Sequence, residues 1–204
     1  MATIKNIIFD LGGVLLDIDT GRTNEAFAKL GVTGFQNQYT LQKADPLFDE
    51  LEKGHIEEAA FYEAIRRKAG LQLLDQEIRD AWNALILEFR TESIERLASL
   101  KEQYNIYLLS NTNRIHYDAF QQQFREKFGN RFFDDCFTRA WYSHQVGMRK
   151  PDAQLFEYAL ASAGILAGET IFIDDLPKNT DAAARLGIKT HLLLPGERIE
   201  NLGW

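Results

Sequence analysis

Cysteine is almost absent from the 204-residue chain, which contains only Cys136. A single cysteine excludes an internal disulfide and any zinc site built on several cysteines. Long apolar stretches are also missing: runs such as Ile7–Phe9 and Leu192–Leu194 fall far short of the roughly 20 residues that a membrane span needs. Residues 1–6 have neither a basic start nor a long apolar stretch, so no export signal is evident. We therefore expect a cytoplasmic protein that does not enter a membrane.

Basic residues are fewer than acidic residues. The chain has 23 Lys and Arg against 30 Asp and Glu, which gives a net charge of −7 at pH 7. A protein of that sign is not attracted as a whole to nucleic acid or acidic lipid, so neither is expected as a partner. An anionic small molecule would have to be held by a local cluster of cations or by a metal ion. Hydrophobic residues make up 45% of the chain, which excludes disorder over most of its length.

The pattern along the chain falls into three parts. Residues 4–9 are β-branched and aromatic, and they predict a buried strand that ends at Asp10. Residues 20–90 carry apolar side chains at helical spacing and predict four short helices without a strand. From residue 92 onward, strand-like and helix-like segments alternate, which is typical of a parallel sheet with helices on both faces. Because one isolated strand is not stable, residues 4–9 must join that sheet.

The predicted fold class is therefore α/β, a doubly wound parallel sheet with an all-helical insertion after the first strand. We place the α/β part at residues 1–17 and 92–204 and the insertion at residues 18–91. Beyond residue 100, the expected strands are 106–109, 136–142, 170–173 and 189–194. The expected helices there are 114–127, 152–163, with Pro151 in its first turn, and 177–186.

Polar side chains follow three of the expected strands, at the points where the strands end. They are Asp10, the run Ser110-Asn111-Thr112 and the pair Asp174-Asp175. Ligands of open parallel sheets bind at the carboxyl ends of the strands, so these side chains should meet at one edge, where Lys150 can reach them. Three carboxylates in one place demand a cation, and their hard oxygen atoms favour Mg²⁺. With a lysine and a hydroxyl, the set suits phosphoryl transfer to a carboxylate.

Each of these residues also has an ordinary structural interpretation. An Asp after a strand is often a turn former or a helix cap, and Ser-Asn-Thr before a helix is a good N-cap sequence. The acidic pair could begin the helix at Pro177, where negative charge suits the helix dipole, and Lys150 could be a solvated surface lysine. The functional interpretation depends on the conjunction, because an acid, a hydroxyl, a lysine and paired acids occur in this order at successive strand ends.

The same order is that of a known family. Over essentially its whole length the chain resembles the haloacid dehalogenase-like hydrolases, in the subfamily whose Rossmann-like core carries a helical cap after the first strand. The motifs that carry the resemblance are Ile-Ile-Phe-Asp-Leu-Gly-Gly-Val-Leu at 7–15, Leu-Leu-Ser-Asn-Thr at 108–112, Gly-Met-Arg-Lys-Pro-Asp at 147–152 and Ile-Phe-Ile-Asp-Asp-Leu-Pro-Lys-Asn at 171–179. Leu-Glu-Lys-Gly-His-Ile-Glu-Glu at 51–58 is similar to a recurrent stretch of the cap.

The resemblance implies a metal site at the acidic residues. Asp10 would be the nucleophile and also a ligand of Mg²⁺. The backbone carbonyl of Gly12 and the carboxylate of Asp175 would be further ligands. Asp174 would lie alongside the metal, often through a water molecule, and Asn179 would support the loop that carries the acidic pair.

The resemblance also implies a phosphate site next to the metal. Ser110 and the amide of Asn111 would bind the transferred phosphoryl group, and Lys150 would stabilise the negative charge on nucleophile and phosphate. Arg114 and Arg149 each stand beside a motif. In an acidic protein both are candidates for contacts to phosphate or hydroxyl groups, with surface ion pairs as the alternative.

Position 12 departs from the family pattern. Most phosphatases of the family carry there a second Asp, which protonates the leaving oxygen and later activates water, whereas Gly12 cannot transfer a proton. A similar opening, with Ser-Asn-Thr-Asn-Arg and Gly-Met-Arg-Lys-Pro later, belongs to a bacterial branch that acts on α-glucose 1-phosphate. The resemblance therefore points to sugar phosphates. Substrate hydroxyls or a cap residue such as His55 could partly replace the missing acid, although His55 also fits a capping position on the surface.

The leading hypothesis is a Mg²⁺-dependent phosphatase of a small phosphorylated metabolite, with an aspartyl-phosphate formed on Asp10. Two alternatives stay open. A dehalogenase would use the same carboxylate without a metal, and the intact acidic pair at 174–175 counts against it. A non-catalytic phosphate-binding regulatory protein is suggested by Gly12 alone. A substrate cannot be named from the sequence, because the side chains of the cap that set specificity carry no motif.

Overall fold

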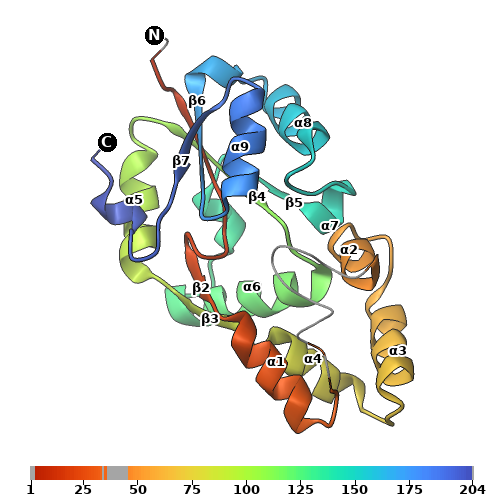
Figure 1. The fold of residues 1–204 in the computed structure, drawn as a ribbon. Coiled ribbons are helices and arrows are strands. Elements are labelled where there is room, and N and C mark those ends of the chain that lie inside the picture. The colour runs from red at the N-terminus through yellow and green to blue at the C-terminus, as the bar shows by residue number, and fades with distance from the viewer. Residues whose placement is uncertain (1–2, 34, 36–45, 204) are drawn as a thin grey trace.

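The central element of the computed structural model is a parallel sheet of five strands (Figure 1). The structure describes residues 3–33, 35 and 46–203. The strands of the sheet are β1 (Asn6–Phe9), β4 (Asn105–Ser110), β5 (Arg139–Tyr142), β6 (Thr170–Asp174) and β7 (Lys189–Leu192). They follow the order β5-β4-β1-β6-β7, and every pairing between neighbours is parallel. The predicted α/β fold is thus confirmed, with β1 in the middle of the sheet.

Helices cover both faces of this sheet because its strands are apolar on both sides. Along β1, Ile7 and Phe9 pack on one face and Ile8 on the other, as the two-residue alternation of a strand requires. The first face is covered by α5 (Thr91–Leu100) and α6 (Arg114–Phe128), and the second by α8 (Ala153–Ala163) and α9 (Pro177–Arg185). Shorter helical turns are α7 (Ser143–Val146), η2 (Phe133–Cys136), η3 (Ala167–Glu169) and η4 (Ile199–Asn201).

In the described part of the chain, four helices between β2 and β3 form a second core. They are α1 (Thr20–Lys29), α2 (Pro46–Glu52), α3 (Glu58–Ala69) and α4 (Asp75–Asn83), here called the helical insert. Their apolar faces meet around aromatic rings, among them Phe48, Phe61 and Trp82. Figure 1 shows α1, α3 and α4 together at the end of the molecule away from both termini. The expected four helices are therefore present, and they bury their own set of side chains.

The expectation of helices alone over residues 20–90 is wrong at its end. Helix α4 stops at Asn83, and β3 (Ile86–Phe89) pairs antiparallel with β2 (Leu16–Ile18). Leu85 and Ile86 have helical spacing, but strand pairing with β2 determines the structure here. The β2–β3 pair links the segment that leads from the sheet into the insert with the segment that leads back. The division at residues 17/18 and 91/92 remains a prediction, and the β2–β3 pair lies at that place.

The start of α8 also differs from the prediction. Pro151 does not stand in the first turn of α8, because Asp152 has an extended backbone (φ −62°, ψ 127°) and is itself the N-cap residue. Helix α9, in contrast, begins with Pro177 in the position that proline prefers. The segment 147–152 therefore approaches the sheet as a loop and not as a helix.

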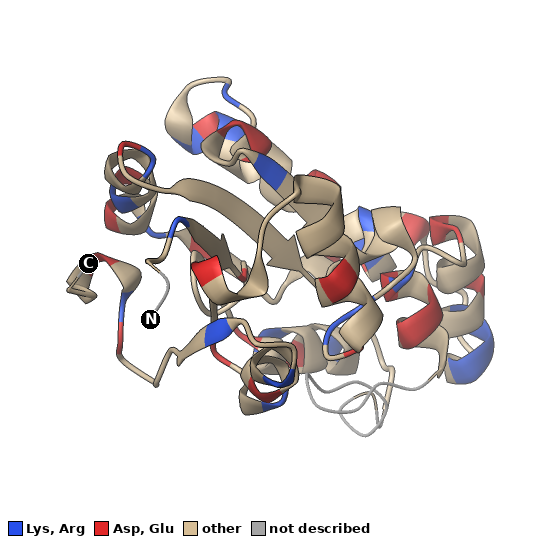
Figure 2. Ribbon diagram, turned by 90° about the horizontal axis from the view of Figure 1, so that it is seen from above, with Lys and Arg blue, Asp and Glu red and all other residues tan. Residues whose placement is uncertain are grey.

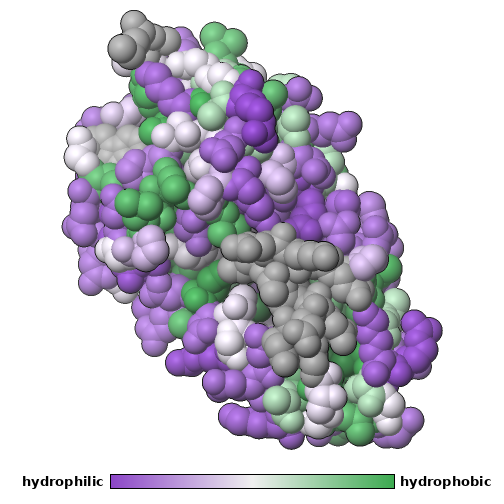
Figure 3. All heavy atoms as spheres, in the orientation of Figure 1, coloured by the Kyte–Doolittle hydropathy of each residue, from purple (hydrophilic) through white to green (hydrophobic). Residues whose placement is uncertain are grey.

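The molecular surface carries both signs of charge. Lys and Arg lie interspersed with Asp and Glu on the helices (Figure 2), and the face seen in Figure 3 is mostly hydrophilic with small separate hydrophobic areas. Among the described residues, none of the helices combines the length and the apolar character that crossing a membrane requires.

Candidate active site

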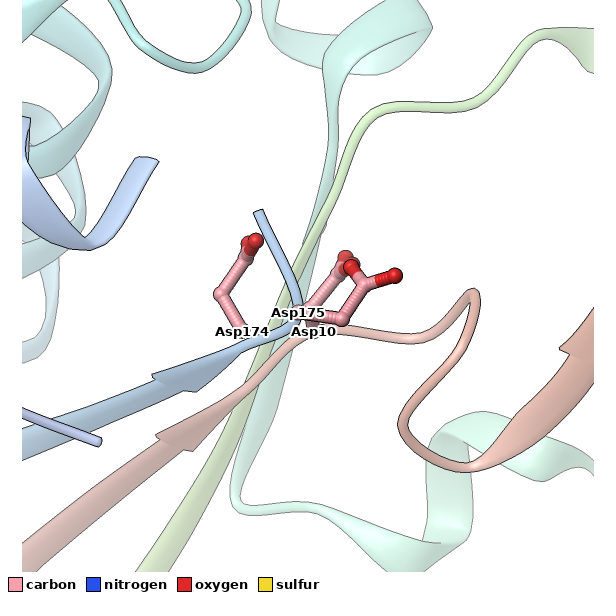
Figure 4. A group of neighbouring side chains, drawn as sticks. All are labelled: Asp10, Asp174 and Asp175. Atoms are coloured by element: carbon pink, nitrogen blue, oxygen red, sulfur yellow. The ribbon is translucent and has the colours of Figure 1, made fainter. Parts of the chain in front are cut away.

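Three carboxylates meet at the carboxyl ends of β1 and β6. These strands are neighbours, with Phe9 paired to Ile173, so the residues that follow them lie side by side. Ligand oxygens of Asp10, Asp174 and Asp175 all lie within 4.8 Å of one another. Figure 4 shows the Asp10 and Asp175 carboxylates directed to the same place and that of Asp174 to the other side. The predicted meeting of these residues at one sheet edge is what the structure shows.

Lys150 is the cation inside this acidic group. Its Nζ lies 2.7 Å from Asp10 Oδ1 and 2.7 Å from Asp174 Oδ2. The lysine side chain is only 1% exposed, so both ion pairs are shielded from water and from salt. One lysine against three carboxylates leaves an excess of negative charge, which a divalent cation can neutralise.

Asp174 is fully engaged by groups of the chain itself. The residue has no solvent exposure, and its Oδ1 accepts a hydrogen bond from the backbone N–H of Leu176 at 2.8 Å. The Asn179 amide Nδ2 lies 3.0 Å from each of the two carboxylate oxygens. Together with Lys150 these donors fill the hydrogen-bonding capacity of Asp174. The geometry thus suits Asp174 to holding Lys150 and the 174–179 loop in position.

Asp175 lies against Gly13, and this contact explains the glycine. Gly13 has φ +76°, and a Cβ on it would stand 2.5 Å from Asp175 Oδ2. Any side chain at position 13 would therefore displace the carboxylate of Asp175 as well as strain the backbone. Because Asp175 is less buried than Asp10 and Asp174, it is the acid of the pair that is open to a ligand.

Burial raises the pKa values of the two acids that face the same way. The pKa of Asp10 rises to about 7, because burial and the charges of Asp174 and Asp175 outweigh the opposing effect of Lys150. The pKa of Asp175 rises to about 6, first through burial and then through Asp174. A divalent cation with oxygen ligands would hold both acids in their ionised form, so the residues present fit Mg²⁺.

We expect Mg²⁺ to stabilise the protein more at pH 8 than at pH 5. Folded-state pKa values above the unfolded value of 3.8 mean that the metal-free folded protein binds these protons more tightly. Its stability is therefore greatest below about pH 4 for these groups and falls as pH rises toward 7. Calorimetric melting with Mg²⁺ and with EDTA checks this. Asp175→Asn should reduce both the pH-dependent loss and the gain from Mg²⁺, and an unchanged gain would remove Asp175 from the metal site.

Two of the residues expected to bind phosphate lie at the end of β4. Ser110 is the last residue of that strand, beside β1, and it lines the same cavity as Asp10 and Lys150. The Asn111 side chain clamps the backbone of Lys150, since its Oδ1 accepts from Lys150 N–H at 2.8 Å and its Nδ2 donates to Lys150 O at 2.9 Å. Helix α6 starts at Arg114, so its N-terminus adds a partial positive charge near this edge.

Other polar residues of the cavity were not predicted from the sequence. They are Glu52 of α2, His116 of α6 and Lys178 of α9. Glu52 and Lys178 lie within the motifs at 51–58 and 171–179, and His116 lies two residues after the run at 110–114. Their residue types alone, however, give no sign of a role in the site. The remaining walls are apolar and come mainly from β2, β3 and α6: Leu16, Ile18, Leu85, Ile86 and Phe120.

Arg149 ties the helical insert to the sheet edge. Its Nη1 lies 2.7 Å from Asp49 Oδ1 and its Nη2 lies 2.8 Å from Glu52 Oε2, both on α2. Glu52 is buried, and burial raises its pKa against the effect of Arg149. The guanidinium that was a candidate for phosphate contacts therefore lines the cavity while it holds two acids of the insert.

Arg149→Met should destabilise the fold by about 3 kcal/mol, because breaking a buried ion pair leaves Glu52 without its main cation. Equilibrium unfolding in urea measures this loss. The double variant Arg149→Met/Glu52→Met should recover most of it, since no unpaired buried acid then remains. A single variant as stable as the parent would show that the pair contributes nothing.

Two further candidates lie away from the cavity. Arg114 pairs with Asp118 at 2.8 Å on the exposed surface of α6 and borders a separate hollow between the insert and α6. His55 is half-exposed, and its Nδ1 lies 3.1 Å from Glu50 Oε2. Neither side chain lines the cavity that contains Asp10. His55 lies on the surface between α2 and α3, and the N-cap residue of α3 is Glu57.

The space beside Gly12 is taken by an apolar side chain. A Cβ placed on Gly12 would lie 3.0 Å from Ile18 Cδ1 of β2. The position where a second acid would project from the loop is thus covered by Ile18, and the cavity is apolar on this side. The close packing of Ile18 therefore goes together with the absence of a side chain at position 12.

Comparison with known proteins agrees with this geometry. Residues 4–187 match the haloacid dehalogenase-like hydrolase family. The chain is 31% identical to a D-ribitol-5-phosphate phosphatase of Bacteroides thetaiotaomicron, over 92% of this chain and 90% of that protein. It is 30% identical to a sesquiterpene phosphatase of Aspergillus oryzae, over 91% of this chain and 88% of the relative.

Solved structures show the same likeness. A haloacid dehalogenase-family enzyme from Bacteroides thetaiotaomicron, solved with magnesium and inorganic phosphate, superposes with a TM-score of 0.87 at 36% identity and covers 95% of this chain and 96% of its own. A hydrolase of Porphyromonas gingivalis, assigned to the same family, gives a TM-score of 0.88 at 34% identity, over 96% of this chain and 94% of its own. In sequence and in fold, the protein belongs to the haloacid dehalogenase-like hydrolase family.

Proposed function

We propose that the protein is a Mg²⁺-dependent phosphatase that hydrolyses a small sugar phosphate or sugar-alcohol phosphate through an aspartyl-phosphate on Asp10. The observation that carries this proposal is the position of Asp10 between Lys150 and Asp175, in one cavity with Ser110 and Asn111. A nucleophile, a buried cation, a metal-binding carboxylate and a phosphate-facing hydroxyl are what phosphoryl transfer to a carboxylate needs. The phosphatases among its relatives support the reaction class.

The first half-reaction moves the phosphoryl group onto the protein. A carboxylate oxygen of Asp10 attacks phosphorus, the bond between phosphorus and the ester oxygen breaks, and the alcohol leaves. Lys150 offsets the charge on both partners, and Ser110 and the Asn111 N–H hold the phosphoryl oxygens. Bound Mg²⁺ supplies charge neutralisation between nucleophile and phosphate, with Asp10, the Gly12 carbonyl and Asp175 as the groups that would hold it.

The second half-reaction returns Asp10 to its starting state. A water molecule attacks phosphorus of the aspartyl-phosphate, and inorganic phosphate leaves with Asp10 restored as a carboxylate. Because Gly12 has no side chain, the departing alcohol of the first half-reaction takes its proton from water, directly or relayed through a substrate hydroxyl. The helical insert, held over the cavity by Arg149, limits the access of bulk water during the transfer.

The substrate class follows from the cavity walls beyond the phosphate. Four polar side chains, Glu52, Arg149, His116 and Lys178, stand among the apolar residues of β2, β3 and α6. Such a mixture suits a carbon chain that carries hydroxyl groups more than it suits a hydrocarbon chain, because buried polar groups need partners. The relative that acts on ribitol 5-phosphate supports this class more than the sesquiterpene phosphatase does.

A panel of phosphate esters tests the proposal. We expect Mg²⁺-dependent phosphate release from ribitol 5-phosphate and α-glucose 1-phosphate, slower release from farnesyl phosphate, and none in EDTA. Chloride release from 2-chloropropionate in EDTA would favour the dehalogenase alternative instead. Binding of inorganic phosphate without turnover of any ester would favour the regulatory alternative.

A further inference from the structure

His116 is a buried histidine at the junction of sheet, insert and cavity. It stands in the first turn of α6, where its backbone N–H donates to Asn113 Oδ1 at 3.0 Å. Its ring stacks on Trp82 of the insert, with ring centroids 4.7 Å apart and planes inclined by 21°. Only 7% of the residue is exposed, and it lines the same cavity as Asp10 and Ser110. Helix, stacking and burial together hold the ring in one orientation.

The two ring nitrogens of His116 are in different situations. Nδ1 lies 2.8 Å from the side-chain oxygen of Asn83, the last residue of α4, and so carries the hydrogen that it donates. Nε2 is buried and finds no hydrogen-bond partner in the described part of the chain. Burial lowers the pKa of His116 to about 3, so the ring is neutral at physiological pH. Nε2 is therefore an acceptor without a donor.

We propose that Nε2 of His116 accepts a hydrogen bond from a hydroxyl group of the substrate and thereby selects hydroxylated phosphate esters over apolar ones. The inference rests on the proposed function, since it concerns the alcohol part of the same ester. The apolar walls of the cavity offer no donor to Nε2, whereas a sugar or a sugar alcohol carries several. His116 acts here as a specificity-determining residue and takes no part in the bond changes at phosphorus.

The physical basis of this selection is the cost of an unpaired polar atom. Nε2 is already buried without a partner, so a methylene group placed beside it gains nothing, whereas a hydroxyl at the same place adds a hydrogen bond and satisfies the acceptor. A site built to hydrogen-bond a substrate hydroxyl discriminates against analogues that lack it more strongly than an apolar pocket discriminates by size. Asn83 supports the selection indirectly, because it fixes which nitrogen carries the hydrogen.

Three esters and three variants test the assignment. Ribitol 5-phosphate and pentyl phosphate share a five-carbon chain and a primary ester but differ in hydroxyl groups, and p-nitrophenyl phosphate lacks hydroxyls altogether. His116→Phe keeps an aromatic ring on Trp82 and removes the acceptor, whereas His116→Gln restores an acceptor oxygen. His144→Phe is the matched control, because the Nε2 of His144 is also buried without a partner, but that ring borders the separate hollow beside α6.

We expect His116→Phe to lower kcat/KM for ribitol 5-phosphate by about tenfold or more and to change the other two values by less than about threefold. His116→Gln should recover part of the loss, and His144→Phe should leave the ratio between the esters as in the parent. Equal losses on all three esters, or no loss on ribitol 5-phosphate, would overturn the assignment. A parent that hydrolyses none of the three esters overturns the proposed function itself, and the assignment with it.

A second measurement does not depend on the folding of the His116 variants. In Asp10→Asn the substrate stays intact when bound, so the ¹⁵N resonance of His116 Nε2 can be followed by NMR. Ribitol 5-phosphate should shift this resonance in the direction of an accepted hydrogen bond, and inorganic phosphate should not. Identical shifts with both ligands would contradict the assignment.

Discussion

Asp10→Asn should lower phosphate release by at least about 10⁴-fold, since removing a nucleophile or its base costs about that much in hydrolases that form covalent intermediates. The amide has the shape of the carboxylate, and its oxygen can still accept from Lys150, so the fold should persist. What is lost is the negative charge on the oxygen that attacks phosphorus. The rate is measured as phosphate release at saturating substrate and Mg²⁺.

A matched variant separates chemistry from folding. Asp19→Asn changes an exposed Asp that caps α1 through its side chain, a role that asparagine also fills. It should keep the parent's rate and melting temperature. Activity of Asp10→Asn within about tenfold of the parent would remove Asp10 from the mechanism.

The second large effect concerns the leaving group. Without an acid at position 12, the departing oxygen must carry more negative charge in the transition state. General acid help is typically worth about 10²–10⁴-fold, so aryl phosphates should outrun simple alkyl phosphates by a margin in this range. A series of substituted phenyl phosphates and alkyl phosphates, all without hydroxyl groups, measures the dependence free of any help from the substrate. A flat series would mean that an acid reaches the leaving oxygen after all.

Restoring the acid requires space as well as a carboxyl group. Gly12→Asp places a side chain against Ile18 Cδ1, which a Cβ alone already approaches to 3.0 Å. We therefore expect little gain from Gly12→Asp by itself and a larger gain from Gly12→Asp/Ile18→Ala. In the double variant the slowest alkyl phosphates should gain most and the slope of the series should flatten. Ile18→Ala alone serves as the control, and equal rates for it and the double variant would contradict this account.

The central sheet and the edge that carries the candidate site were predictable because they depend on local signals. Apolar strands, the polar residues that end them and the rule that parallel strands align their carboxyl ends place Asp10, Ser110 and Asp174 together. The contacts that each of these groups makes became clear only from the structure. The clamp of Asn111 on Lys150 and the ion pair of Lys150 with Asp174 join residues far apart in sequence.

The missed features share a physical cause. Residues 85–86 have helical spacing in sequence, but β3 forms because β2 offers a partner nearly 70 positions earlier in the chain. The contact of Ile18 with Gly12 and the ion pair of Arg149 with Glu52 also depend on which segments the fold brings together. Periodicity reports which face of an element is apolar, but it does not report which distant segment packs there. Arg114 illustrates the converse, since it follows a motif closely and yet turns to Asp118.

The central place of β1 has a consequence for the order in which the chain folds. Asn6 pairs with Asn105 on one side and with Thr170 on the other. The first strand to leave the ribosome therefore gains both of its neighbouring strands only after β6 has been synthesised. The helical insert can collapse earlier, because the described residues of its core, Ile115 excepted, all precede β3 in the chain. Until β6 has been synthesised, β1 keeps an open, apolar edge, which is the arrangement that promotes aggregation. Nascent or truncated chains that end before residue 170 therefore carry this hazard.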